Sequence, residues 1–196
     1  MSGLIHVFNG ADSQIDIAKI IVKKLANSRL SDSISDSLSS DSVVICLSTK
    51  CGIKSDLINS WAILRERQIP IVFAVTDLSN PELDFDDFYP IISKIFEPVL
   101  TPYLVLHAEN GEAAGLIDLV DLKVIDYSDE NRAERVADAE HKELVNEFRE
   151  DLMERLDSEW SNFTNGIDCL AIPIEAKNNL GFLELKRFLD LVPSLS

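Results

Sequence analysis

The chain has 196 residues, 46% of them hydrophobic, which is enough for one domain with a substantial core. Its 18 basic and 34 acidic residues give a formal net charge of -16, which repels a phosphate backbone and argues against direct nucleic-acid binding. No apolar stretch approaches the ~20 residues that span a bilayer and no export signal begins the chain, so we expect a cytoplasmic protein that binds no membrane. A basic protein surface is the natural electrostatic partner of such a chain, although an excess of acid also serves solubility alone.

Strands and helices alternate along the chain. Continuous apolar runs are typical of strands covered on both faces of a parallel sheet, and apolar side chains at every third or fourth position indicate helices. These patterns predict strands at residues 4–8, 43–47, 69–75, 101–107 and 168–174, and helices at residues 15–25, 54–67, 86–96 and 181–191. Strand-helix-strand units of this kind predict a doubly wound α/β sheet.

Three further segments have their own character. Residues 28–42 form a Ser/Asp tract with recurring apolar residues, so the tract is either a flexible linker or an exposed amphipathic helix. Residues 115–124 are apolar and β-branched, which favours strand pairs outside the main sheet. Residues 133–160 carry many acidic side chains around an apolar helical stripe, which predicts an acidic helix.

Neither the cysteines nor the histidines form a recognisable catalytic or metal site. Cys46, Cys51 and Cys169 lack the paired spacing of zinc ligands, and we interpret them as packing residues. The three histidines lie in predicted strands or on the acidic helix, where structural or surface roles are expected. The sequence therefore predicts no catalytic residue and no metal ligand.

The first strand-to-helix loop is the place where a phosphate-binding loop of the form G-x-x-x-x-G-K-[ST] would lie. The best alignment begins at Ser13, passes through Asp16 and places Ala18 at the second glycine, Lys19 at the lysine and Ile20 at the magnesium-binding hydroxyl. A β-carbon at residue 18 obstructs close approach to a phosphate, and an isoleucine cannot coordinate magnesium. The loop is therefore predicted to be at most a vestige of a GTP and magnesium site, with no working cofactor.

Several segments outside this loop resemble the G domain of elongation factor G and its ribosomal-protection relatives. The segment "SVVICLSTKCGI" at residues 42–53, followed by Trp61, resembles the family's fourth strand and next helix. The segment "GEAAGLIDLVDLK" at residues 111–123 resembles the inserted strands of that family, and "HKELVNEFREDLME" its inserted acidic helix. Residues 173–182 and 191–194 resemble its closing guanine loop and Leu-Pro-Ser exit.

The resemblance implies a three-layer, P-loop-NTPase-like G domain with a mostly parallel sheet and an inserted α+β subdomain. Residues 1–107 and 166–196 would form the core, and residues 108–165 the insertion. The chain departs from the family at the guanine motif, where Val75 replaces Asn and Thr76-Asp77 follow. In the closing loop, Glu175 replaces Ser before Ala176 and Lys177. Residues 25–43 are also too few to hold both family switches.

The losses together favour a pseudo-GTPase, a G-domain scaffold that binds protein partners without hydrolysing GTP. The resemblance implies the ribosomal stalk protein as a partner of the inserted subdomain, with Glu147, Glu150 and Asp151 as candidate contacts. An acidic helix with an apolar stripe is more often only a solvated helix packed on its own domain. Two alternatives stay open: a GTP-binding N-terminal domain of a translation elongation factor that acts with further domains on the ribosome, and an α/β domain that binds an unrelated small ligand.

Overall fold

Sheet A is the centre of the fold in this computed structural model, which describes residues 3–11, 17–31, 33, 39–129 and 132–194. The sheet has six strands in the order β2-β1-β3-β4-β10-β5, and every neighbouring pair is parallel. The strands are β1 Ile5–Asn9, β2 Ser28–Ser31, β3 Ser42–Ser48, β4 Ile71–Thr76, β5 Val99–Leu100 and β10 Cys169–Pro173. Every residue of β3, β4 and β10 is buried, as the continuous apolar runs predict.

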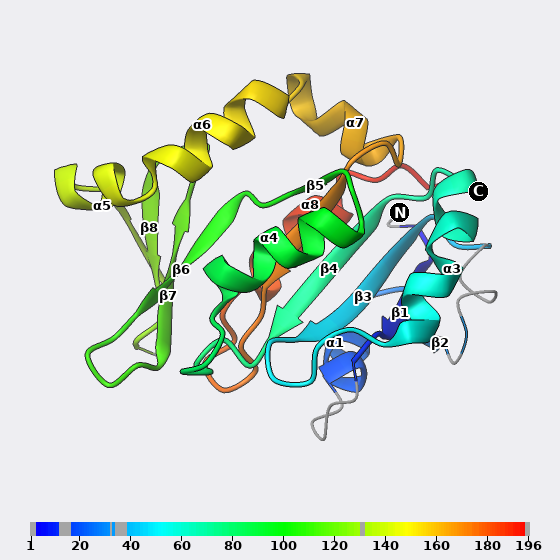
Figure 1. Cartoon of the computed structure of the whole chain (residues 1–196), viewed down its shortest axis with the longest axis horizontal. Coiled ribbons are helices and arrows are strands. Elements are labelled where there is room, and N and C mark those ends of the chain that lie inside the picture. Colours follow the sequence, from blue (N-terminus) through cyan, green and yellow to red (C-terminus); the bar gives the residue numbers. More distant parts are fainter. Residues whose placement is uncertain (1–2, 12–16, 32, 34–38, 130–131, 195–196) are drawn as a thin grey trace.

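Helices cover both faces of sheet A and make three layers (Figure 1). The four helices are α1 Ile17–Lys24, α3 Ser55–Glu66, α4 Phe85–Ile95 and α8 Phe182–Leu189. Figure 1 shows α3 and α4 on the near face of the sheet and α8 behind it. Lys24 at the end of α1 donates a hydrogen bond to Asn179, which lies in the loop that precedes α8. On the near face, the rings of Trp61, Phe73 and Phe96 stack between the helices and β4.

Sheet B is a second, antiparallel sheet at one end of sheet A, with the order β6-β7-β8-β9. Its strands are β6 Tyr103–His107, β7 Ala113–Asp118, β8 Lys123–Asp126 and β9 Ala133–Val136. The chain then returns to sheet A through α5 Ala139–Leu144, α6 Asn146–Arg155, η1 Ser158–Trp160 and α7 Ser161–Thr164. The expected mixed α/β fold with a mostly parallel sheet is therefore present, and the expected strand pairs at 115–124 lie in sheet B.

Three sequence predictions of single elements were wrong. Residues 28–31, expected as a linker or a helix, form β2 on the edge of sheet A; residues 32 and 34–38 of the same tract lie outside the described residues. Residues 103–107, expected in the main sheet, pair with β7 in sheet B. Residues 133–160 begin with β9 and are interrupted at Glu159 and Trp160, whose φ angles of 57° and 59° are left-handed.

One glycine fixes the return of the chain to sheet A. Gly166 has a φ of 68°, and a β-carbon there would lie 1.9 Å from the carbonyl oxygen of Gln68. Only glycine fits this close approach of two backbones. No helix in the described part of the chain is long and apolar enough to cross a membrane.

Candidate functional site

The carboxyl edge of sheet A brings together the loops that follow β1, β3, β4 and β10, because the ends of parallel strands meet at one edge. This edge contains the described residues of the predicted vestigial nucleotide site. Ser13 and Asp16 lie outside the described residues. The remaining residues are Ala18 and Lys19 on α1, Thr76 and Asp77 at the end of β4, and Glu175, Ala176 and Lys177 after β10.

The start of the first loop is packed against the core. Gly10 donates its backbone N–H to the Cys46 carbonyl at 2.9 Å, and its own carbonyl accepts from Lys54 at 2.9 Å. A β-carbon at Gly10 would lie 2.9 Å from Ile45 and 3.0 Å from Leu47. Ala18 is fully buried, whereas Lys19 on the next position of α1 is exposed. Glycine at position 10 and alanine at position 18 thus serve packing between β1, β3 and α1.

The end of β4 is held by hydrogen bonds to the end of β3. The buried Thr76 hydroxyl donates to the Leu47 carbonyl at 3.1 Å. The Asp77 carboxylate accepts from the Ser48 hydroxyl at 2.5 Å, and its backbone carbonyl accepts from the Thr49 hydroxyl at 2.7 Å. Asp77 has a left-handed φ of 61°, a conformation that Asp tolerates better than most residues. The residue expected to read guanine is therefore engaged by the neighbouring loop.

The loop after β10 turns toward sheet B. The Glu175 carboxylate accepts from the Lys177 backbone N–H at 3.3 Å, and Ala176 lies half-buried between them. The Lys177 ammonium forms an ion pair with Glu112 of the β6–β7 hairpin, which raises the pKa of Lys177 and lowers that of Glu112. Asp77 and Lys177 follow neighbouring strands, yet they bond to different partners.

The described residues of this edge do not fit GTP and magnesium. Ala18 fills the core where the second glycine of a phosphate loop is needed, Ile20 offers no hydroxyl, and Asp77 is hydrogen-bonded to Ser48. Among the described residues, no group of three or more His, Cys, Asp or Glu side chains is placed to hold a metal ion.

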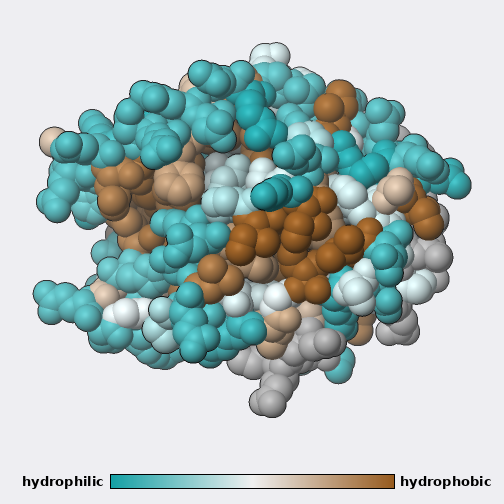
Figure 2. Space-filling view, in the orientation of Figure 1, coloured by the Kyte–Doolittle hydropathy of each residue, from teal (hydrophilic) through white to brown (hydrophobic). Residues whose placement is uncertain are grey.

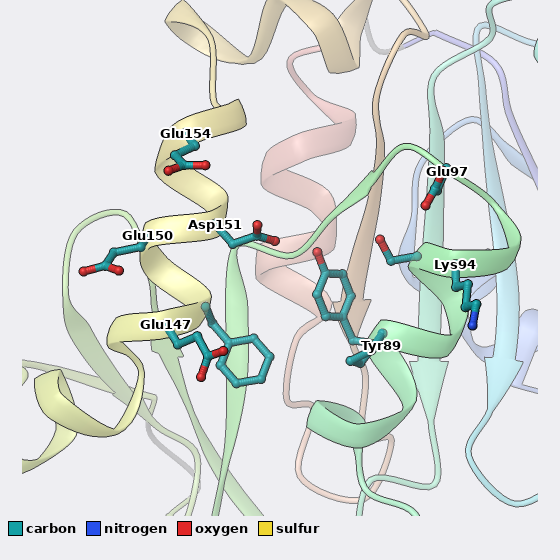
Figure 3. Close-up of a pocket in the computed structure, with 10 residues that line it drawn as sticks. Tyr89, Lys94, Glu97, Glu147, Glu150, Asp151 and Glu154 are labelled. Atoms are coloured by element: carbon teal, nitrogen blue, oxygen red, sulfur yellow. The ribbon is translucent and has the colours of Figure 1, made fainter.

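A groove of 670 Å³ lies between α4 and α6, and we call it the acidic groove (Figure 3). It is lined by Tyr89, Pro90, Ser93, Lys94, Glu97, Glu147, Phe148, Glu150, Asp151 and Glu154. All three residues that the sequence predicts as partner contacts, Glu147, Glu150 and Asp151, thus line one hollow. Figure 3 shows Asp151 directed from α6 toward Tyr89 of α4, whereas Glu150 points away from α4.

Local sequence explains the form of both walls. The α4 helix begins after Asp84, whose carboxylate caps it by accepting the Asp87 N–H at 2.9 Å. It buries Phe85, Phe88, Tyr89 and Ile92, and it contributes Tyr89, Pro90, Ser93 and Lys94 to the groove. The α6 helix buries Leu152, half-buries Phe148 and contributes Glu147, Glu150, Asp151 and Glu154 to the groove lining.

The lining of the acidic groove carries mainly negative charge, although Arg155 also acts electrostatically on Tyr89. Five carboxylates and one ammonium, that of Lys94, line it. Within the described part of the chain, Glu97, Glu147, Asp151 and Glu154 have no hydrogen bond or ion pair, and Glu150 accepts only from Asn146 at 2.7 Å. Burial raises the pKa of Tyr89, which keeps its hydroxyl neutral and donating to the Val99 carbonyl at 3.1 Å.

An apolar surface adjoins the acidic groove. Figure 2 shows hydrophobic side chains gathered over α3 and α4, below a hydrophilic band that follows α6. Ile91 and Ile95 on α4 and Ile58 on α3 are 42%, 37% and 44% exposed. An exposed apolar surface next to a charged groove is typical of protein-binding faces.

A buried ionic cluster joins sheet B to α8, and the sequence analysis missed it. The Glu184 carboxylate is 2% exposed and accepts from the Tyr127 hydroxyl at 2.6 Å and from Arg132 at 3.0 Å. Burial, followed by the bond to Glu184, raises the pKa of Tyr127. Arg187 of α8 similarly donates to the Tyr103 hydroxyl at 3.2 Å. Glu184 looks like an ordinary surface residue in the sequence, and only its contact with sheet B shows otherwise.

Comparison with known proteins yields a fold and no family. No protein-family model matches the chain, and no curated protein matches it. Among solved structures, the crystal structure of ttk003000868 from Thermus thermophilus is similar over 99% of this chain, with a TM-score of 0.71 and 14% sequence identity. The similar region covers 40% of that protein, so this chain spans less than half of its length. At this identity, the two chains share a fold, and no activity is carried from one to the other.

Proposed function

We propose that this chain is a protein-interaction module with a degenerate G domain of the elongation factor G type, which binds a partner and does not hydrolyse GTP. The observation that carries the proposal is the acidic groove. Its carboxylates line one hollow, and four of the five have no partner within the described part of the chain. Carboxylates that line one hollow make its electrostatic potential negative, and a negative potential attracts a cationic partner.

The chemistry of the groove favours a protein partner over a metal or a nucleic acid. Tyr89 and Phe148 offer aromatic surface beside the carboxylates, and aromatic groups contribute strongly at protein interfaces. A net charge of -16 repels nucleic acid. A basic protein face is complementary to both features, and the resemblance in the sequence suggests the ribosomal stalk protein as the first candidate.

The carboxyl edge of sheet A supports the absence of GTP hydrolysis. Ala18 is buried, Asp77 is bonded to Ser48, and Lys177 is paired with Glu112. Isothermal titration with GTP and with GDP, each with magnesium, tests this part of the proposal. We expect no saturable heat and no release of phosphate; micromolar binding with turnover would refute it.

The partner is tested by pull-down with purified stalk protein. The variant Glu147→Lys/Glu150→Lys/Asp151→Lys reverses the charge of α6, and we expect it to lose capture. The matched control is Asp56→Lys/Glu66→Lys/Glu82→Lys, which makes the same change of charge at exposed positions outside the groove. Equal capture by both variants would show that net charge, and not the groove, determines binding.

Two alternative functions are each favoured by one observation. The resemblance of the sequence to elongation factor G favours a GTP-binding domain of a translation factor, in which case GTP would bind and the partner would be the ribosome. A pocket of 280 Å³ at the end of β10, lined by Glu175, Lys177 and Ser79 among others, favours a small-ligand domain. Binding of GTP in the titration would support the first alternative over the proposed function. Binding of a compound from a screen of small polar ligands would support the second alternative.

A further inference from the structure

A second hollow of 350 Å³ lies between α1, α8 and the three residues Tyr127, Asp129 and Arg132, and we call it the basic pocket. It is lined by Lys24, Leu25, Tyr127, Asp129, Arg132, Asn178, Asn179, Phe182, Leu183 and Lys186. None of these residues lines the acidic groove, and Asn178 and Tyr127 alone are shared with the pocket at the end of β10. The basic pocket is therefore a separate place on the molecule.

The described lining of the basic pocket carries more cationic than anionic side chains. Three cationic side chains, those of Lys24, Arg132 and Lys186, come from three different segments, and Asp129 is the only carboxylate among the described lining residues. Arg132 pairs with Glu134 and Glu184, and Lys186 pairs with Asp190, and these three carboxylates do not line the pocket. Cationic side chains that converge on a concave site favour recognition of an anion.

Arg132 is held by two carboxylates that do not line the basic pocket. Arg132 donates to Glu184 at 3.0 Å and to Glu134 at 2.6 Å. These two carboxylates line a neighbouring hollow of 100 Å³ and do not line the basic pocket. A guanidinium has five N–H donors, so Arg132 keeps donors for a ligand while its position is fixed. The ion pair of Lys186 with Asp190 is exposed on α8, and exposed pairs of this kind exchange readily.

The walls of the basic pocket are apolar and aromatic. Leu25 and Phe182 are each 7% exposed and Tyr127 is 4% exposed, which leaves mainly their pocket-facing atoms accessible. The Lys24 ammonium lies 4.8 Å from the centre of the Phe182 ring and donates to the Asn179 amide oxygen at 2.7 Å. An ammonium held over an aromatic face presents a cation next to an apolar surface.

We propose that the basic pocket binds a small organic anion, namely a carboxylate or a phosphate monoester on an aromatic or short aliphatic body. The acid group lies among Lys24, Arg132 and Lys186, and the body lies against Phe182 and Tyr127. The side-chain amides of Asn178 and Asn179 supply further hydrogen bonds at the rim. This site is independent of the partner-binding groove and of the edge of sheet A.

The test is a two-dimensional NMR titration of nitrogen-labelled full-length protein with phenylacetate, phenyl phosphate and the uncharged phenylacetamide. We expect saturable shifts for the anions at the amides of residues 24–25, 127–129 and 178–183. The variant Lys24→Ala/Lys186→Ala should weaken phenylacetate binding by about tenfold, since it removes charged hydrogen-bond donors. The control Lys23→Ala/Lys142→Ala loses the same charge at exposed positions outside the pocket and outside the acidic groove, and should bind as the parent does.

The outcomes decide the proposal in both directions. Stronger binding of either anion than of phenylacetamide, lost in the first variant and kept in the control, supports it. Equal affinity of the anions and phenylacetamide, equal affinity of the two variants, or no saturable shift at these amides overturns it. A thermal unfolding curve for each variant confirms that both are folded at the titration temperature.

Discussion

Removal of the Glu184 carboxylate is predicted to be the most destabilising single polar change in the described part of the chain. Glu184→Ala leaves the hydroxyl of the buried Tyr127 and the guanidinium of Arg132 without their shared acceptor. Breaking a buried ion pair by removing one partner typically costs about 3–5 kcal/mol. The Arg132 side chain is 29% exposed and is rehydrated in part, so we expect a loss of about 2–3 kcal/mol.

The assay is unfolding in urea followed by tryptophan fluorescence, because Trp160 packs edge-on against Phe188 of α8. With a slope of about 2–3 kcal/mol per molar urea, the midpoint should fall by about 1 M. Glu184→Gln keeps an acceptor of the same shape and should cost less. The double variant Arg132→Met/Glu184→Leu removes both charges and should recover much of the stability. A loss below about 0.5 kcal/mol for Glu184→Ala, or purely additive effects in the double variant, would refute the reasoning.

Three further predictions concern a buried acid, two glycines and the thiols. Burial is the main cause that raises the pKa of Asp86 from 3.8 to about 6, so the native state binds more protons and stability falls as pH rises between these values. Asp86→Asn should abolish this slope and add about 2 kcal/mol at pH 7, measured as urea midpoints across pH. Gly181→Ala should lower the free energy of unfolding by more than about 2 kcal/mol, because the φ of residue 181 is 83° and a β-carbon would lie 1.9 Å from a carbonyl oxygen. Gly111→Ala should lower it by about 1 kcal/mol, because residue 111 has a φ of 79° but open space around it. Thermal unfolding of both variants measures the difference. Burial raises the pKa of the Cys169 thiol to about 12, so a thiol reagent should modify the exposed Cys51 first, as mass spectrometry of partly labelled protein would show.

Sequence patterns predicted the parallel sheet because its central strands are apolar throughout. The run at residues 69–75 becomes β4, which is wholly buried, and the stripe at 54–67 becomes α3 with Leu57 and Leu64 inward. The edge strands escaped detection for the opposite reason. In β2 only Ser31 is buried, and every residue of β9 is exposed. A strand at a sheet edge that is held mainly by backbone hydrogen bonds needs no alternation of apolar and polar residues, so its sequence carries no pattern that predicts a strand.

The candidate site was predictable only in part. The carboxylates of α6 form a visible acidic run, but the opposite wall with Tyr89 and Glu97 depends on where α4 packs. The loss of a phosphate loop at Ala18 stays a prediction, whereas the bond between Asp77 and Ser48 depends on how two loops meet and has no signal in the sequence. Contacts between distant segments have no local signal in one sequence.

The ion pairs of the described residues are distributed differently at the acidic groove and at the cluster between sheet B and α8. The arginines of the described cluster, Arg132 and Arg187, pair with buried acids between sheet B and α8, where the charges hold two elements together. The groove keeps only Lys94 against five carboxylates. All five groove carboxylates are exposed, so water screens them and their lack of partners costs the free protein little stability. A negative surface of this kind attracts a cationic partner over a distance, and for that reason the proposed partner is assigned to the groove and not to the buried cluster.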